Sequence, residues 1–166
     1  SKYNQKWSIR IARYFNPISN HHSGLIKENP KGTPNNLLPL IIKVAQKKTT
    51  SLNVYGKNYP TKDGTCVRDY IHVMDVADGH ISIIKKNIDH NGFKVYNFGT
   101  GKGSTVLEII EAFEKYTGKI VSYKFTERRK GDATTSICNP NKAIKELNWR
   151  AKYNLNQAMM DINKIL

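Results

Sequence analysis

Three side chains have the chemistry that best fits a ligand with both phosphates and hydroxyls. They belong to two arginines and one aspartate. Arg68 lies in residues 64–75, a stretch that combines a glycine turn, a short strand and a helix start. Arg129 and Asp132 lie in a polar loop closer to the C-terminus. Because a planar guanidinium makes paired, charge-assisted hydrogen bonds, two arginines suit a diphosphate. An aspartate suits a ribose hydroxyl, so these residue types favour a nucleotide.

Each of these polar residues also has a plain structural interpretation. Arg68 could pair with Asp63 or Asp69, which lie near it in the sequence. Asn16 could serve turn chemistry before the proline that follows it, and Asn36 could be only a helix N-cap. Spacing along the chain does not by itself link these residues into one site.

A glycine loop at residues 99–103 follows an expected strand and precedes an expected helix, the arrangement that often binds phosphate. The dinucleotide pattern requires glycine at position 104, where this chain has Ser104. The P-loop pattern requires Ser or Thr directly after the lysine, but Gly103 follows Lys102. We therefore expect a turn near a ligand rather than an independent nucleotide site.

Metal and hydrolase chemistry have little support. No G-x-S-x-G motif is present. Cys66 and Cys138 are too far apart for a zinc motif or a disulfide framework, so we expect reduced thiols and a cytoplasmic protein. The five histidines have no metal-ligand spacing, so we expect no metal: His21, His22, His72, His80 and His90.

The chain of 166 residues carries a formal net charge of +14. Its lysines are spread along the whole length, and the densest clusters are only two or three residues long. This distribution favours a solvated basic surface over a nucleic-acid footprint. No apolar run has membrane-spanning length and no leader pattern is visible, so we expect a soluble protein.

Strand and helix patterns alternate along the chain, which predicts an α/β fold with parallel or mixed pairing. A helix with Ser104 or Thr105 as its cap has Glu108 near the capping-box offset and stops at Gly118. Asp75 lies at another helix start, where a carboxylate suits a cap. We expect strands at 7–14, 52–56, 68–72, 93–98 and 119–125, further helices at 35–48, 73–87, 141–147 and 154–166, a long functional or lid-like loop at 18–34, and an exposed polar loop at 128–138.

Taken together, six motifs resemble the UDP-glucose 4-epimerase family of extended short-chain dehydrogenase/reductases. Two of them, RDYIHV and YNFG, are shared with other sugar-nucleotide enzymes, whereas NYPT at 58–61 points to the epimerases. The resemblance runs in order along nearly the whole chain. The motifs are RYFNP at 13–17, PNNL at 34–37, GTCVRDYIHVMD at 64–75, YNFGTG at 96–101, RRKGD at 128–132 and LNW at 147–149.

The resemblance implies the C-terminal, substrate-binding part of an extended Rossmann-type enzyme. Residues 1–17 would be the last part of the NAD-binding domain and 18–166 the UDP-sugar-binding domain, with 68–98 packing back on the Rossmann sheet. The family's GxxGxxG loop and Tyr-x-x-x-Lys motif do not occur here, because no tyrosine has a lysine four positions later. We therefore expect a fragment without the N-terminal NAD-binding half, inactive by itself.

The implied reaction is NAD-dependent C4 epimerisation of UDP-glucose and UDP-galactose in galactose metabolism, by a homodimeric isomerase. The resemblance assigns Arg68 and Arg129 to the diphosphate and Asp132 to the ribose. The other implied residues are Asn16, Asn36 and Leu37 for phosphate or hexose, Asn53 and Tyr55 for uracil, and Tyr14 and Phe15 for the nicotinamide pocket.

One position departs from some members of the family. Ser136 stands where they carry a bulky tyrosine, so we expect room for UDP-N-acetylhexosamines. Two alternatives stay open: another NAD-dependent sugar-nucleotide enzyme, such as a decarboxylase or dehydratase, and a non-catalytic basic module that binds nucleotides or nucleic acid.

Overall fold

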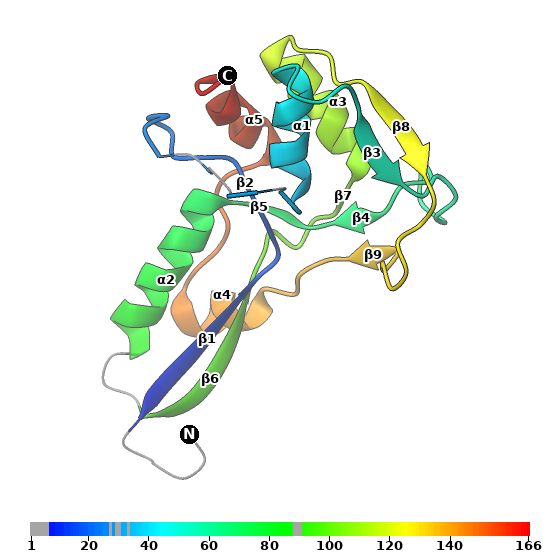
Figure 1. The fold of residues 1–166 in the computed structure, drawn as a ribbon. Coiled ribbons are helices and arrows are strands. Elements are labelled where there is room, and N and C mark those ends of the chain that lie inside the picture. The colour runs from blue at the N-terminus through cyan, green and yellow to red at the C-terminus, as the bar shows by residue number, and fades with distance from the viewer. Residues whose placement is uncertain (1–6, 27, 29–30, 33, 88–90) are drawn as a thin grey trace.

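The computed structural model describes residues 7–26, 28, 31–32, 34–87 and 91–166. The fold is α/β, with short strands and helices arranged in a narrow lower arm, a central crossing region and a wider upper part (Figure 1). His90 and parts of the long loop expected at 18–34 lie outside the described residues. Within the described part, no helix is both long enough and apolar enough to cross a membrane.

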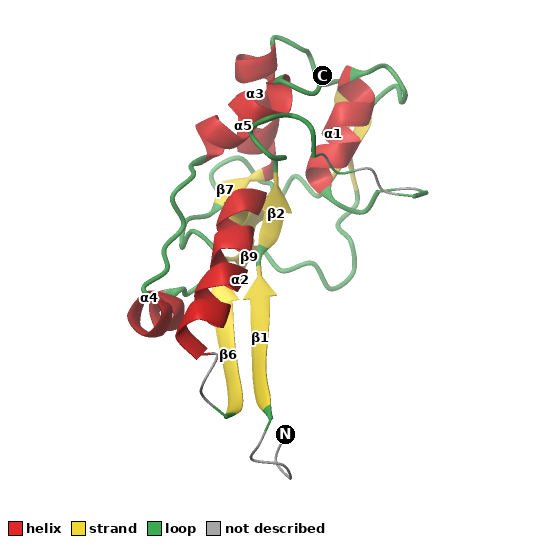
Figure 2. Cartoon of the chain, turned by 90° about the vertical axis from the view of Figure 1, so that its left-hand side faces the viewer, coloured by secondary structure: helices red, strands yellow, loops and turns green. Residues whose placement is uncertain are grey.

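The lower arm is a parallel pair of strands flanked by two helices. Strand β1 (Ser8–Tyr14) pairs with β6 (Gly92–Phe98) along its whole length. Helices α2 (Val73–Asn87) and α4 (Asn141–Leu147) pack beside them (Figure 2). This region has its own small core, in which the following side chains are buried: Ile71, Ile83, Tyr96, Phe98, Ala143, Leu147 and Trp149.

The upper part packs three helices around a second parallel strand pair. Strands β3 (Leu52–Tyr55) and β8 (Tyr123–Thr126) pair in register, with α1 (Leu37–Ala45), α3 (Val106–Thr117) and α5 (Leu155–Asn163) in the same core. The apolar positions of α3 recur at helical spacing and lie inward, as the sequence pattern predicts.

Very short strands connect the two parts. Strand β2 (Asn16–Ile18) pairs in parallel with β5 (Tyr70–His72). Strand β4 (Val67–Arg68) lies between β7 (Ser104–Thr105) and β9 (Thr135–Ser136) in a three-stranded sheet. Three segments that are distant in sequence therefore meet residues 67–72, and these five short strands form the central crossing region.

Asp69 holds this crossing region together. Its carboxylate is fully buried and accepts hydrogen bonds from the Thr100 amide (2.9 Å), the Thr100 hydroxyl (2.6 Å), the Gly101 amide (2.9 Å) and the Cys138 amide (3.2 Å). A Cβ atom on Gly99 would lie 2.3 Å from the Cys138 Cβ, so this close approach requires glycine. The glycine loop at 99–103 therefore binds the chain's own carboxylate.

The predicted signals hold at both ends of α3 but not at the start of α2. Thr105 and Glu108 form the capping box of α3, and Gly118 ends it with a φ of 66°. Asp75 lies in the first turn of α2, but its carboxylate accepts hydrogen bonds from the backbone amides of Lys152 (2.9 Å) and Tyr153 (3.0 Å). It therefore ties α2 to the segment before α5, and the prediction of a helix cap was wrong.

The prediction from sequence omitted three short strands and placed some element boundaries incorrectly. The predicted loop at 128–138 contains β9, and β2 and β7 were not predicted at all. Strand β8 begins at Tyr123 rather than 119, and α1 and α5 end earlier than predicted, at Ala45 and Asn163. Strands of two or three residues have no periodicity of their own, because pairing with distant segments stabilises them.

Replacing Asp69 tests its role. We expect Asp69→Ala to lower the free energy of unfolding by about 3 kcal/mol or more, because four donors would lose a buried charged acceptor. Chemical denaturation would measure the change. As a matched control, Asp78→Ala removes an exposed partner of Lys152 and should change stability by less than about 1 kcal/mol. Equal effects of the two substitutions would contradict the assignment.

Candidate functional site

A cavity of about 180 Å³ opens between the crossing region, the start of α1 and strand β3. Eight of the residues proposed from the sequence line it together: Asn16, Asn36, Leu37, Asn53, Tyr55, Arg68, Arg129 and Asp132. They come from five separate parts of the chain. The fold thus forms the grouping that spacing alone did not establish.

Arg68 and Arg129 share Asp132. The Arg68 Nη2 atom lies 3.4 Å from Asp132 Oδ1, and the Arg129 Nε atom lies 3.6 Å from Asp132 Oδ2. Arg68 Nη1 also donates to the Val67 and Ala133 carbonyl oxygens, both at 2.8 Å. Two cations against one carboxylate leave a net positive charge at the cavity wall.

The local ion pairs suggested for Arg68 do not form. Asp63 accepts hydrogen bonds from the Thr65 amide and the Thr105 hydroxyl, and Asp69 binds the glycine loop. Burial disfavours the charge of Asp63, but hydrogen bonds from Thr105 and Thr65 outweigh this and lower its pKa overall. Both carboxylates serve the fold, which leaves Arg68 to face the cavity.

An aromatic ring beside Arg129 also lines the cavity. The Arg129 Cζ atom lies 4.1 Å from the centre of the Tyr55 ring, a distance typical of a cation–π contact. Asn53 precedes Tyr55 by two residues on β3 and is exposed. An exposed amide two residues from an aromatic ring provides hydrogen-bonding and stacking groups on one strand.

Two other proposed asparagines, Asn16 and Asn36, also line the cavity. Asn16 begins β2, and its amide donates to the Asp69 carbonyl oxygen at 3.0 Å. Asn36 occupies the N-cap position of α1, but its side chain makes no capping hydrogen bond. The interpretation of Asn36 as only a cap is therefore wrong, and its amide group lies on the cavity wall.

Three proposed residues lie outside the cavity lining. Ser136 is opposite Arg68 in the β4–β9 pair and is half-buried. Tyr14 lies at the end of β1 and is 52% exposed, with its ring 6.1 Å from that of His80. The Phe15 amide donates to the Phe98 carbonyl oxygen at 3.0 Å. The cavity brings together the residues expected to hold the nucleotide, but not those expected beside the cofactor.

The sequence analysis did not assign seven of the lining residues to the site: Asn35, Leu40, Leu52, Val54, Cys66, Tyr70 and Val106. Two of them, Cys66 and Tyr70, flank Arg68 in the sequence. Both lie two positions from Arg68, and all three line the cavity, whereas Asp69 between them binds the glycine loop. Extended backbone places alternate side chains on one face, so this spacing could have identified them. Burial raises the pKa of Tyr70, so its hydroxyl stays protonated as a hydrogen-bond donor.

No group of three or more His, Cys, Asp and Glu side chains is placed to hold a metal ion among the described residues. The chemistry available at the cavity is that of arginine, amide and phenol groups beside a carboxylate. Such groups bind phosphate oxygens, hydroxyls and a planar base without a metal ligand set.

The fold is the α/β fold of extended Rossmann-type short-chain dehydrogenase/reductases. It is similar to the crystal structure of UDP-glucose 4-epimerase from Bifidobacterium longum in complex with NAD+ and UDP, with a TM-score of 0.92 and 44% identity over 98% of this chain and 48% of that one. A family model described as GDP-mannose 4,6 dehydratase matches residues 2–162, and the chain belongs to this family.

The chain is also similar to two further proteins, one matched by sequence and one by structure. The chain is 51% identical over 158 residues to a UDP-glucose 4-epimerase of Cyamopsis tetragonoloba, covering 94% of this chain and 45% of that protein. The UDP-Glc/GlcNAc 4-epimerase of Campylobacter jejuni has a TM-score of 0.74 and 31% identity, over 93% of this chain and 47% of that one. The chain thus spans about half the length of the relatives it matches.

Both cysteines should react slowly in the folded protein. Burial raises the pKa of the Cys66 thiol, although the positive charge of Arg68 opposes this, and burial raises the pKa of Cys138 to about 12. At pH 8, we expect alkylation by iodoacetamide at least about ten-fold slower than in the denatured chain, with the rate still rising above pH 9. A Cys138→Ser variant isolates Cys66. A native rate equal to the denatured rate would contradict this prediction.

Proposed function

We propose that this chain is the UDP-sugar-holding part of an NAD-dependent enzyme that interconverts UDP-glucose and UDP-galactose by epimerisation at C4. One observation carries the proposal: two arginines, an aspartate, four asparagines and two tyrosines line one cavity. Relatives named as UDP-glucose 4-epimerases support it.

Each lining group has a chemical role in this proposal. Arg68 and Arg129 bind the diphosphate, whose charge replaces part of their contact with Asp132. Asp132 can then accept a hydrogen bond from a ribose hydroxyl. Asn53 and Tyr55 hold the uracil, and Asn16, Asn36 and Leu37 lie where phosphate and hexose would follow.

The binding energy comes from the nucleotide and not from the reacting sugar carbon. Tight binding of the diphosphate keeps the hexose near the nicotinamide. The hexose itself is held loosely, so it can present either face of C4. NAD would supply the hydride acceptor and donor for this chemistry. This chain contributes only Tyr14 and Phe15 to that site in our proposal, at the exposed end of β1.

The domain assignment is also a proposal. Residues 1–17 would end the NAD-binding domain and 18–166 would form the substrate domain, in a cytoplasmic homodimer. Apolar side chains on the lower arm support a covered position there, because Trp7, Ile11 and Phe93 are strongly exposed. Catalytic turnover is not assigned to these 166 residues alone, since they contain no Tyr-x-x-x-Lys motif.

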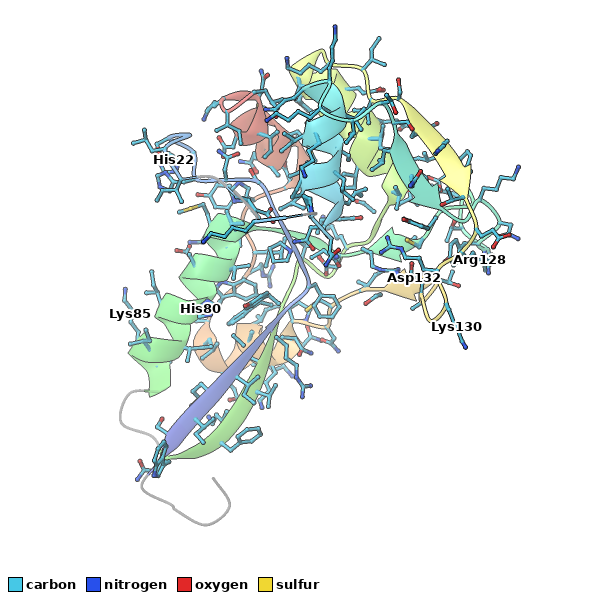
Figure 3. All side chains as sticks on the ribbon, viewed as in Figure 1. His22, His80, Lys85, Arg128, Lys130 and Asp132 are labelled. Atoms are coloured by element: carbon cyan, nitrogen blue, oxygen red, sulfur yellow. The ribbon has the colours of Figure 1, made fainter. Side chains whose placement is uncertain are left out.

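Calorimetric titration with UDP tests the nucleotide site. We expect Arg68→Ala to weaken UDP binding about 10- to 100-fold, because it removes a charge-assisted contact to phosphate. Lys130→Ala is the matched control: this lysine is exposed on the same loop but does not line the cavity (Figure 3). Equal affinity for wild type and Arg68→Ala would contradict the diphosphate assignment.

Acceptance of N-acetylated sugars tests Ser136. We expect the full-length enzyme to turn over UDP-GlcNAc, because a serine leaves room for the acetyl group that a tyrosine would fill. Ser136→Tyr should reduce kcat/KM for UDP-GlcNAc at least about ten-fold and leave that for UDP-glucose within about three-fold. A wild-type enzyme inactive on UDP-GlcNAc would refute the proposal.

A further inference from the structure

A second arginine–tyrosine contact lies beside the cavity but outside it. The Arg128 Cζ atom lies 3.9 Å from the centre of the Tyr59 ring. The Arg128 Nε atom donates to Asn58 Oδ1 at 2.8 Å, and its Nη2 atom donates to the Asn58 carbonyl oxygen. The guanidinium therefore contacts residues 58–59, and Arg128 does not line the cavity, unlike Arg129.

The turn that receives Arg128 has a closely packed backbone. Gly56 has a φ of 82°, and a Cβ atom there would lie 2.6 Å from the Tyr59 ring and 2.8 Å from the Arg128 Cγ. The Tyr59 amide donates to the Gly64 carbonyl oxygen at 3.0 Å, and the Tyr59 side chain is buried. The ring is thus a fixed surface on which the stem and head of Arg128 lie.

Arg128 and Arg68 hold the two ends of one loop. Arg128 stands at the start of the loop between β8 and β9, and Arg68 donates to the Ala133 carbonyl oxygen near its end. Arg129 and Asp132 lie between these anchors, and the Asp132 amide donates to the Arg129 carbonyl oxygen at 3.2 Å. Figure 3 shows Arg128 and Asp132 on this loop, next to the end of β8.

We propose that Arg128 is a positioning residue that fastens this loop to residues 58–59 and so places Arg129 and Asp132 for the nucleotide. The proposal rests on the nucleotide site described above. Tyr55 and Tyr59 lie on either side of Gly56, so consecutive arginines stack on two rings of one strand and turn. When Arg128 no longer contacts residues 58–59, Arg129 can move away from the Tyr55 ring and Asp132 can move away from Arg68.

Lysine cannot replace Arg128 in this role. A guanidinium offers a planar face to the ring and a fork of donors to the Asn58 oxygens, whereas an ammonium is a compact charge. The Lys variant therefore keeps the net charge of the loop and removes the fastening. This separates positioning from a general electrostatic attraction of the diphosphate.

The experiment uses the full-length enzyme and calorimetric titration with UDP. We expect Arg128→Lys and Arg128→Ala each to raise the UDP Kd about ten-fold and KM in parallel, with kcat within about two-fold, because the contact lies remote from the reacting carbon. Asn58→Ala, at an exposed position, should raise Kd about three-fold without risk to folding. Lys130→Ala should match wild type.

A double-mutant cycle shows whether Arg128 acts through Arg129. In the Arg129→Ala background, Arg128→Ala should weaken binding by less than about three-fold, since Arg129, the cation among the two residues that it positions, is already absent and only the placement of Asp132 is still affected. Additive losses would overturn the proposal, as would unchanged UDP affinity in both Arg128→Lys and Asn58→Ala. If wild type does not bind UDP, the proposed function itself fails. If the wild type binds UDP and Arg129→Ala weakens this binding, the nucleotide site stands and the cycle tests only the positioning role of Arg128.

Discussion

The buried carboxylate of Asp69 is the interaction on which the rest of this fold depends. It joins the crossing strands to the glycine loop and to the segment at Cys138, with four donors on one side chain. A buried charge without such donors would be strongly unfavourable, so the three segments must converge for the fold to be stable. The constraint also decides the site, because Asp69 points to the glycine loop while Arg68 and Tyr70 line the cavity.

The glycine loop shows how one physical arrangement can serve two purposes. A strand, a glycine turn and a helix present backbone amides that suit an anion. Here the anion is Asp69, and the amides of Thr100 and Gly101 are its donors. In the proposed function, the arginines bind the diphosphate of the ligand, and their contacts with Asp132 can be exchanged for contacts with phosphate oxygens.

The cavity lies where the upper part and the crossing region meet. Strand β3 supplies Asn53 and Tyr55, the start of α1 supplies Asn36, and the loop after β8 supplies Arg129 and Asp132. Strand β3 and α1 are held by the upper core, and the loop after β8 is held by the hydrogen bonds of Arg128 and Arg68. Such preorganisation lowers the cost of ordering a binding site.

Local sequence determined much of the protein. Apolar spacing was enough for α2, and capping signals with apolar spacing were enough for α3. The family resemblance along the chain identified eight of the residues that line the cavity. Only the tertiary structure decided the partners: Asp132 rather than Asp63 or Asp69 for Arg68, the glycine loop for Asp69, and the amides of Lys152 and Tyr153 for Asp75. It also decided the strands of two or three residues. Helix signals act over a few neighbouring residues, whereas a short strand or a buried carboxylate is satisfied by groups that only folding brings close.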